Sequence, residues 1–77
     1  MPTILQANGF RFFFYTNDHE PKHVHVFKGG VKVKVEIETL SLVANNGMKE
    51  GELKQALEIV KTRQAQFLKE WDEYFSE

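Results

Sequence analysis

The sequence predicts a single α+β domain, in which an antiparallel meander of three to four strands packs against one long C-terminal amphipathic helix. Three observations predict this fold class. The first half of the chain alternates between polar and apolar residues, which is typical of strands. The second half repeats apolar residues at steps of three and four, which is typical of a helix. The length of 77 residues allows one domain, 1–77, with the sheet over 1–46 and the helix over 48–76.

An aromatic run at residues 10–16 predicts the first strand, because aromatic residues favour strands and turn-forming residues flank the run. The core side of this strand is assigned three phenylalanines: Phe10, Phe12 and Phe14. The opposite assignment would bury Arg11, which is unfavourable for a charged side chain. The other side of the strand therefore carries Arg11, Phe13 and Tyr15.

Residues 22–28 and 31–38 predict a β-hairpin, because both segments alternate and Gly29-Gly30 between them is a two-residue turn signal. This turn opposes five pairs of residues: Phe27 with Lys32, Val26 with Val33, His25 with Lys34, Val24 with Val35 and His23 with Glu36. Directly opposed residues share a face of the sheet, so the valines gather on one face and the histidines on the other. A shift of one residue would destroy this match.

Residues 40–44 predict a short fourth strand, and the polar residues 45–47 then break the chain. From Lys49 to Phe75 apolar residues recur at helical spacing without an intervening proline. This segment predicts one amphipathic helix, which would cover the valine face of the sheet.

The length of this helix exceeds that of the sheet. It would extend about 40 Å, whereas an eight-residue strand spans about 26 Å. The helix therefore either breaks near Thr62 or overhangs the sheet. An overhang would present an apolar surface to a second copy or to a partner protein. That surface would consist of four aromatic residues: Phe67, Trp71, Tyr74 and Phe75.

The composition restricts the class of protein. There is no cysteine, which excludes disulfides and thiolate metal ligands. No segment reaches the roughly 20 apolar residues of a membrane span, and no signal peptide is recognised, so we expect a cytoplasmic protein without membrane contact. Residues 1–35 hold five basic and two acidic residues, whereas 36–77 hold five basic and nine acidic residues. A phosphate-bearing ligand would therefore contact the first half.

All three histidines fall within seven residues, at positions 19, 23 and 25. His23 and His25 are two apart on one predicted strand, so they point to the same side, with Cα atoms about 6.5–7 Å apart. The loop can return His19 towards them. Glu36 lies opposite His23 in the predicted register. A divalent metal such as zinc would then have four candidate ligands: His19, His23, His25 and Glu36.

Metal-free catalysis is a second interpretation, because one neutral and one protonated imidazole supply a base and an acid near neutral pH. RNA cleavage by the 2′-hydroxyl needs this pair and a cation for the phosphate. The candidate catalytic residues are Arg11, His19, His23 and His25. The candidate substrate-binding residues are Tyr15, Phe27, Lys32 and Lys34. In a third interpretation the histidines line a solvent-facing side of the sheet or a surface that packs against another protein.

Four segments of the chain, residues 1–4, 9–15, 19–26 and 71–75, resemble a family of short bacterial proteins known as domain of unknown function 4160. The aromatic strand followed by His-x-Pro-x-His-x-His is the most specific part. The resemblance implies a bacterial or phage-borne protein, encoded beside a second small protein and proposed as half of a toxin–antitoxin pair. The family has no established activity. The chain departs from its usual pattern at Lys22, where proline is common, and at Lys49, where serine is expected.

The working hypothesis is a toxin-like component of a two-protein bacterial module, acting on RNA or another phosphate-bearing ligand through the histidine face. It would be a ribonuclease, with or without a metal. One rival is a non-enzymatic binding module, such as an antitoxin, which forms a homodimer or docks a small protein encoded nearby. The other rival is a domain that holds a divalent metal through its histidines.

Overall fold

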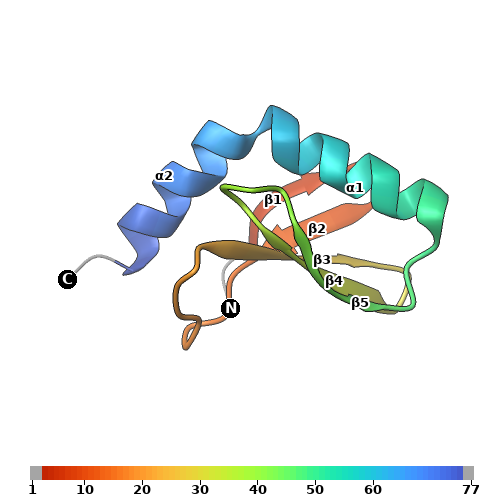
Figure 1. Cartoon of the computed structure of the whole chain (residues 1–77), viewed down its shortest axis with the longest axis horizontal. Helices are drawn as coiled ribbons and strands as arrows, with labels where there is room; N and C mark the ends of the chain where they lie inside the picture. The colour runs from red at the N-terminus through yellow and green to blue at the C-terminus, as the bar shows by residue number, and fades with distance from the viewer. Residues whose placement is uncertain (1–2, 76–77) are drawn as a thin grey trace.

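A computed structural model describes residues 3–75 and shows five strands followed by two helices (Figure 1). The elements are β1 (Thr3–Ala7), β2 (Phe10–Phe13), β3 (His23–Lys28), β4 (Val31–Glu36), β5 (Leu42–Asn46), α1 (Glu50–Thr62) and α2 (Gln64–Phe75). All neighbouring strands are antiparallel, and their order in the sheet is their order along the chain. The predicted α+β class and meander are therefore confirmed. Within residues 3–75, neither helix has the length and apolar character needed to cross a membrane.

The edge strands differ from the sequence-based prediction. β1 was not predicted, and it pairs with β2 through a register that shifts between Thr3 and Leu5. Such a bulge hides the period of two on which strand prediction depends. The predicted fourth strand at 40–44 lies two residues further on, at Leu42–Asn46, because Leu40 adopts a left-handed turn with φ of 63°. The sheet thus has five strands instead of three to four.

The central hairpin of β3 and β4 has the predicted register. The observed pairs include His23 with Glu36, His25 with Lys34 and Phe27 with Lys32. Gly29 and Gly30 both have positive φ, at 57° and 83°, as a two-residue hairpin turn requires. Val24, Val26, Val33 and Val35 are buried in the core and Val31 packs partly buried against it, so the assignment of faces is confirmed for the valine side.

The predicted single helix is interrupted at Arg63, close to the break that the length argument allowed near Thr62. The Thr62 hydroxyl donates to the backbone oxygen of Glu58, a contact that tends to bend a helix. The side-chain amide of Gln64 donates to the backbone oxygens of Ile37, at 2.8 Å, and Glu38, at 3.1 Å. The break between the helices therefore coincides with side-chain hydrogen bonds from Gln64 to the backbone just after β4.

The alternative of an aromatic overhang is wrong for Phe67 and Trp71, whereas Tyr74 is 39% exposed. Phe67 is fully buried and Trp71 is only 3% exposed, because the bend brings α2 down over the end of the sheet. The Trp71 ring lies 5.3 Å from the ring of Phe14 and 4.2 Å from that of Phe75. A homodimer or partner complex stays a prediction, but Trp71 is a core residue of its own chain and not a free anchor for one.

Candidate functional site

The loop between β2 and β3 folds back over the face of the sheet that lies opposite the helices. Asp18 closes this loop, since its carboxylate accepts a hydrogen bond from the backbone N–H of Tyr15 at 2.9 Å. The backbone N–H of Asp18 in turn donates to the Tyr15 carbonyl oxygen at 3.2 Å. At the far end of the loop, Lys22 forms an ion pair of 2.9 Å with Asp72 on α2, and this hydrogen bond raises the pKa of Lys22.

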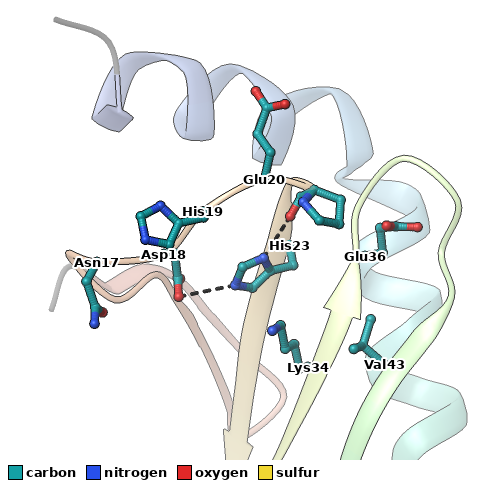
Figure 2. Close-up of a pocket in the computed structure, with 9 residues that line it drawn as sticks. Asn17, Asp18, His19, Glu20, His23, Lys34, Glu36 and Val43 are labelled. Atoms are coloured by element: carbon teal, nitrogen blue, oxygen red, sulfur yellow. Dashed lines mark hydrogen bonds and ion pairs between the residues drawn. The ribbon is translucent and has the colours of Figure 1, made fainter.

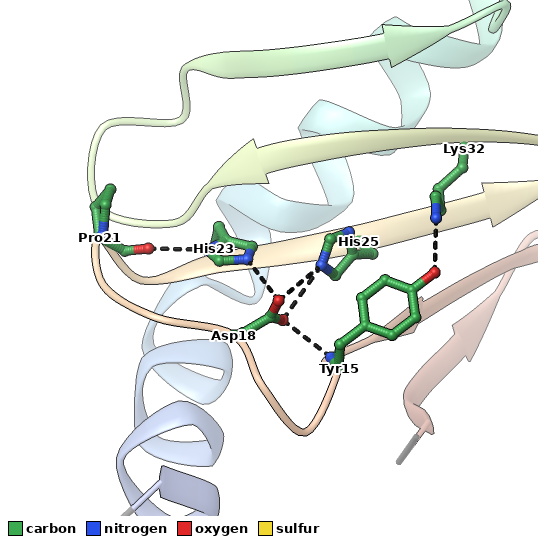
Figure 3. Close-up of polar contacts among 6 residues, drawn as sticks. All are labelled: Tyr15, Asp18, Pro21, His23, His25 and Lys32. Carbon is green, nitrogen blue, oxygen red and sulfur yellow. Dashed lines mark hydrogen bonds and ion pairs between the residues drawn. The ribbon is translucent and has the colours of Figure 1, made fainter.

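The carboxylate of Asp18 meets the two imidazoles of β3 (Figure 3). Its Oδ1 lies 3.2 Å from Nε2 of His23, and its Oδ2 lies 3.2 Å from Nε2 of His25. These three side chains can each offer one ligand atom, and the three atoms lie within 4.8 Å of one another. We refer to Asp18, His23 and His25 as the Asp–His cluster.

The two histidines make different contacts with the carboxylate. Nδ1 of His23 lies 2.8 Å from the carbonyl oxygen of Pro21 and must carry the hydrogen, because a carbonyl only accepts. The Nε2 of His23 is buried and makes no hydrogen bond of acceptable geometry, although it lies close to Asp18. Nε2 of His25, in contrast, donates a hydrogen bond to Asp18. Neutral His23 would therefore direct a lone pair at a carboxylate.

The expected solvent-facing side for the histidines is wrong. His23 is 4% exposed and His25 is 7% exposed. The Phe13 and Tyr15 rings lie against His25, and the Trp71 ring lies against His23. Burial lowers the pKa of His25, and the hydrogen bond to Asp18 offsets this only in part. Burial also raises the pKa of Asp18, but the hydrogen bonds from the Tyr15 N–H and from His25, together with the proximity of His23, outweigh it, so that the pKa is lowered.

The structure places the other two predicted metal ligands outside the Asp–His cluster. A pocket of about 420 Å³ opens beside His23, and both His19 and Glu36 line it (Figure 2). His19 is exposed on the loop. The Glu36 carboxylate is directly opposite His23 in the register, but it accepts a hydrogen bond from Thr39 at 2.5 Å. Both groups thus lie near the cluster without joining it.

The predicted catalytic and substrate-binding residues divide between two places. Arg11, Tyr15, Phe27 and Lys32 line a separate pocket of about 290 Å³ further along the same face. Lys34 instead lines the pocket beside His23 and another of about 260 Å³ next to His25. Tyr15 connects the two places, since its ring contacts His25 at 4.5 Å and its hydroxyl accepts a hydrogen bond from Lys32 at 2.6 Å.

Sequence reasoning missed Asp18. It stands in the Asn17-Asp18 turn, where an aspartate is readily explained by local hydrogen bonding to the backbone. Asp18 makes that bond to Tyr15 and also faces the histidines. The only available signal was the presence of a carboxylate in the short loop that precedes a histidine pair.

The chain was compared with known proteins in three ways. No curated protein and no solved structure is significantly similar to it. A model of one protein family, described as Domain of unknown function (DUF4160), matches residues 9–72. The matched region includes β2, the loop that carries Asp18, the histidine strand and most of α2. The chain therefore belongs to the DUF4160 family, as its aromatic strand and histidine motif indicated.

Proposed function

We propose that the protein binds one divalent metal ion, with zinc as the first candidate, through Asp18, His23 and His25. The observation that carries this proposal is the environment of the His23 Nε2 atom. This atom is buried, has no hydrogen-bond partner among residues 3–75, and lies 3.2 Å from the Asp18 carboxylate. Two acceptors at this distance repel each other, and a cation between them would turn the repulsion into coordination.

The donor set supports the proposal. Two imidazole nitrogens and one carboxylate oxygen are ligands that zinc binds at about 2.0–2.2 Å. A tetrahedral ion with such bonds separates its ligands by about 3.4 Å. The Oδ1 of Asp18 lies 3.2 Å from His23 and 3.4 Å from His25, which matches this separation. Coordination then requires the hydrogen of neutral His25 to move from Nε2 to Nδ1, so that the Nε2 lone pair is free to bind the ion.

The surroundings of the cluster also support a metal. The Pro21 carbonyl orients His23 by accepting from Nδ1, as outer partners of metal-bound histidines commonly do. The pocket beside His23 is lined by three carboxylates, those of Asp18, Glu20 and Glu36, against one lysine, Lys34. This excess of negative charge favours a cation over a phosphate. Three protein ligands would leave a fourth position for water or a substrate, and a bound zinc would act there as a Lewis acid.

Zinc titration of the metal-free protein by calorimetry tests this proposal. We expect one site per chain. Asp18→Asn keeps the shape of the side chain but removes its charge, and it should weaken zinc binding at least tenfold, as should His23→Gln. His19→Gln is the matched control, because His19 lies next to Asp18 but outside the cluster. Equal zinc affinity in the Asp18 and His19 variants would overturn the proposal.

A second candidate function uses the same three residues without a metal. A proton on His23 Nε2 would relieve the same repulsion, and it would make His23 and His25 an acid–base pair held by Asp18. This alternative predicts no specific zinc binding. It also predicts that the His23→Gln variant loses any catalytic activity of the protein that requires a protonated imidazole.

The biological setting that we propose is a toxin-like, two-protein bacterial module acting on a phosphate-bearing ligand such as RNA. The two-protein setting rests on what the sequence resemblance implies, and the phosphate-bearing ligand is suggested by the cationic residues beside the cluster. Expression of the protein alone should then arrest growth, His23→Ala should abolish the arrest, and the neighbouring protein should relieve it. Unchanged growth on expression, with the protein soluble and folded, would favour the rival role as a binding module.

A further inference from the structure

Two adjoining pockets lie along the histidine face, beyond the Asp–His cluster. The first has a volume of about 290 Å³ and is lined by Arg11 and Lys32 among others. The second, of about 260 Å³, is lined by His25, Lys32 and Lys34. The two pockets share Lys32 and Asn46, so they form a trough that extends from Arg11 to His25. We refer to this feature as the cationic trough.

The charge of the trough differs from that of the pocket beside His23. Its lining includes three cationic side chains, those of Arg11, Lys32 and Lys34, and no carboxylate. In the part of the chain that the structure describes, neither Arg11 nor Lys32 forms an ion pair with an acidic residue. Uncompensated cations gathered in a concave surface favour an anionic ligand.

Two cationic side chains of the trough have hydrogen-bond donors that no acceptor among the described residues uses. The Nε of Arg11 is buried and lacks a partner within the described residues. The ammonium of Lys32 donates to the Tyr15 hydroxyl, which leaves two further donors available. Arginine and lysine donors of this kind form strong charge-assisted bonds to phosphate oxygens.

Aromatic rings line the same trough. The Arg11 guanidinium lies 5.3 Å from the Phe13 ring centre and 5.6 Å from that of Phe27. Phe27 remains 37% exposed, so that part of its ring is accessible to a ligand. An exposed ring beside cationic groups is the arrangement on which proteins stack the bases of single-stranded nucleic acids.

We infer that the cationic trough binds one nucleotide unit, with its phosphate on Arg11 and Lys32 and its base stacked on Phe27. The pocket volumes, about 290 and 260 Å³, support no more than one unit, because each lies just below the range for ligand pockets, about 300–1,000 Å³. This inference narrows the phosphate-bearing ligand proposed above to a nucleotide. It does not depend on the metal, because the trough and the Asp–His cluster have only His25 in common.

The test is a titration of isotope-labelled protein in EDTA, followed by amide chemical shifts, with adenosine monophosphate (AMP), adenosine and inorganic phosphate as separate probes. We expect AMP to shift the signals of Arg11, Phe27 and Lys32, and to bind at least tenfold more tightly than adenosine or phosphate. Lys32→Gln should weaken AMP binding about tenfold, the effect of losing one charge-assisted bond. Phe27→Ser should weaken AMP binding but leave phosphate binding unchanged.

Lys61→Gln is the matched control, because it removes the same charge from an exposed position on α1 and should leave AMP binding unchanged. Titration with an oligoadenylate of four nucleotides distinguishes an RNA strand from a free nucleotide as the ligand. Tighter binding of the oligoadenylate than of AMP indicates an RNA strand, and equal or weaker binding indicates a free nucleotide. Equal AMP affinity in the Lys32 and Lys61 variants, or no shifts around Phe27, would overturn the inference. Zinc titration of Lys32→Gln keeps the two proposals separate: weakened AMP binding with intact zinc binding supports the trough independently of the metal, and unchanged AMP binding with intact zinc binding contradicts the trough alone.

Discussion

The imidazole of His23 donates from Nδ1 to the carbonyl oxygen of Pro21 across 2.8 Å, and this contact fixes which nitrogen faces Asp18. A proline residue has no backbone N–H, so its carbonyl is its only polar group. The orientation of His23 is therefore set by the loop residue that lies two positions before it.

The first prediction concerns the tautomer of His23. In metal-free protein at neutral pH, we expect Nδ1 to carry the hydrogen, because the carbonyl of Pro21 accepts it. Long-range ¹H–¹⁵N correlation spectra check this directly. Added zinc should change the Nε2 signal of His23 and leave Nδ1 protonated. His19, which is exposed, serves as the internal reference with mixed tautomers. A neutral His23 with its hydrogen on Nε2 would contradict the arrangement.

The second prediction concerns acid sensitivity of the metal-free protein. Burial lowers the pKa of His25 in the folded state, so the unfolded chain binds more protons as pH falls below the ordinary value of 6.5. Stability should therefore fall from about pH 6.5 downwards, through the folded-state pKa, with a slope of up to about 1.4 kcal/mol per pH unit. The lowered pKa of Asp18 adds a similar loss only below 3.8. Urea denaturation at pH 7, 6 and 5 in EDTA measures the slope.

Two variants identify the source of that slope. His25→Gln should flatten it between pH 7 and 5, since the titrating group is removed. His19→Gln should leave it unchanged, because His19 is exposed. A slope that persists in His25→Gln would show that another group causes the acid sensitivity.

The third prediction concerns the break between α1 and α2. Gln64→Ala removes two hydrogen bonds and leaves the Ile37 carbonyl without its side-chain donor. We expect a loss of about 1–3 kcal/mol in the free energy of unfolding. Gln55→Ala, at an exposed position on α1, is the control and should change stability by less than about 0.5 kcal/mol. Equal effects of the two substitutions in urea denaturation would show that the hydrogen bonds of Gln64 contribute nothing to the free energy of unfolding.

The fourth prediction concerns Trp71. Because it is buried against Phe14, Phe75 and His23, Trp71→Ala should lower stability by about 3–5 kcal/mol. Urea denaturation measures the loss, and light scattering measures the mass. Tyr74→Ala, which truncates a half-exposed ring of the same helix, should cost less. If the Trp71→Ala variant is as stable as the wild type but differs from it in the mass measured by light scattering, Trp71 belongs to an interface between chains instead.

The sheet could be predicted well only where a regular pattern and a specific turn coincide. The hairpin of β3 and β4 has strict alternation and Gly29-Gly30, and its register was predicted correctly. β1 was not predicted, because a bulge interrupts the two-residue alternation by which a strand is recognised. The helix break depends on a contact from Gln64 to residues 26 and 27 positions earlier, which local periodicity does not reveal.

The candidate site could be predicted only in part. His23 and His25 follow from strand geometry, since residues two apart share a face. The contribution of Asp18 depends instead on how the loop returns over the sheet, and loop closure has no sequence period. The burial of His25 depends in turn on the Phe13 and Tyr15 rings that cover it. Sequence reasoning placed those two rings on the correct face but did not anticipate that they would exclude solvent.

The meander has a consequence for the speed of folding. Each strand pairs only with the strand that comes next in the chain, so no long segment must be closed before the sheet forms. Topologies dominated by such local pairings pass their folding barrier quickly, on a timescale of about milliseconds or less for mixed domains. The loop that carries Asp18 joins two neighbouring strands, so the Asp–His cluster is also assembled from groups that lie close together in the sequence.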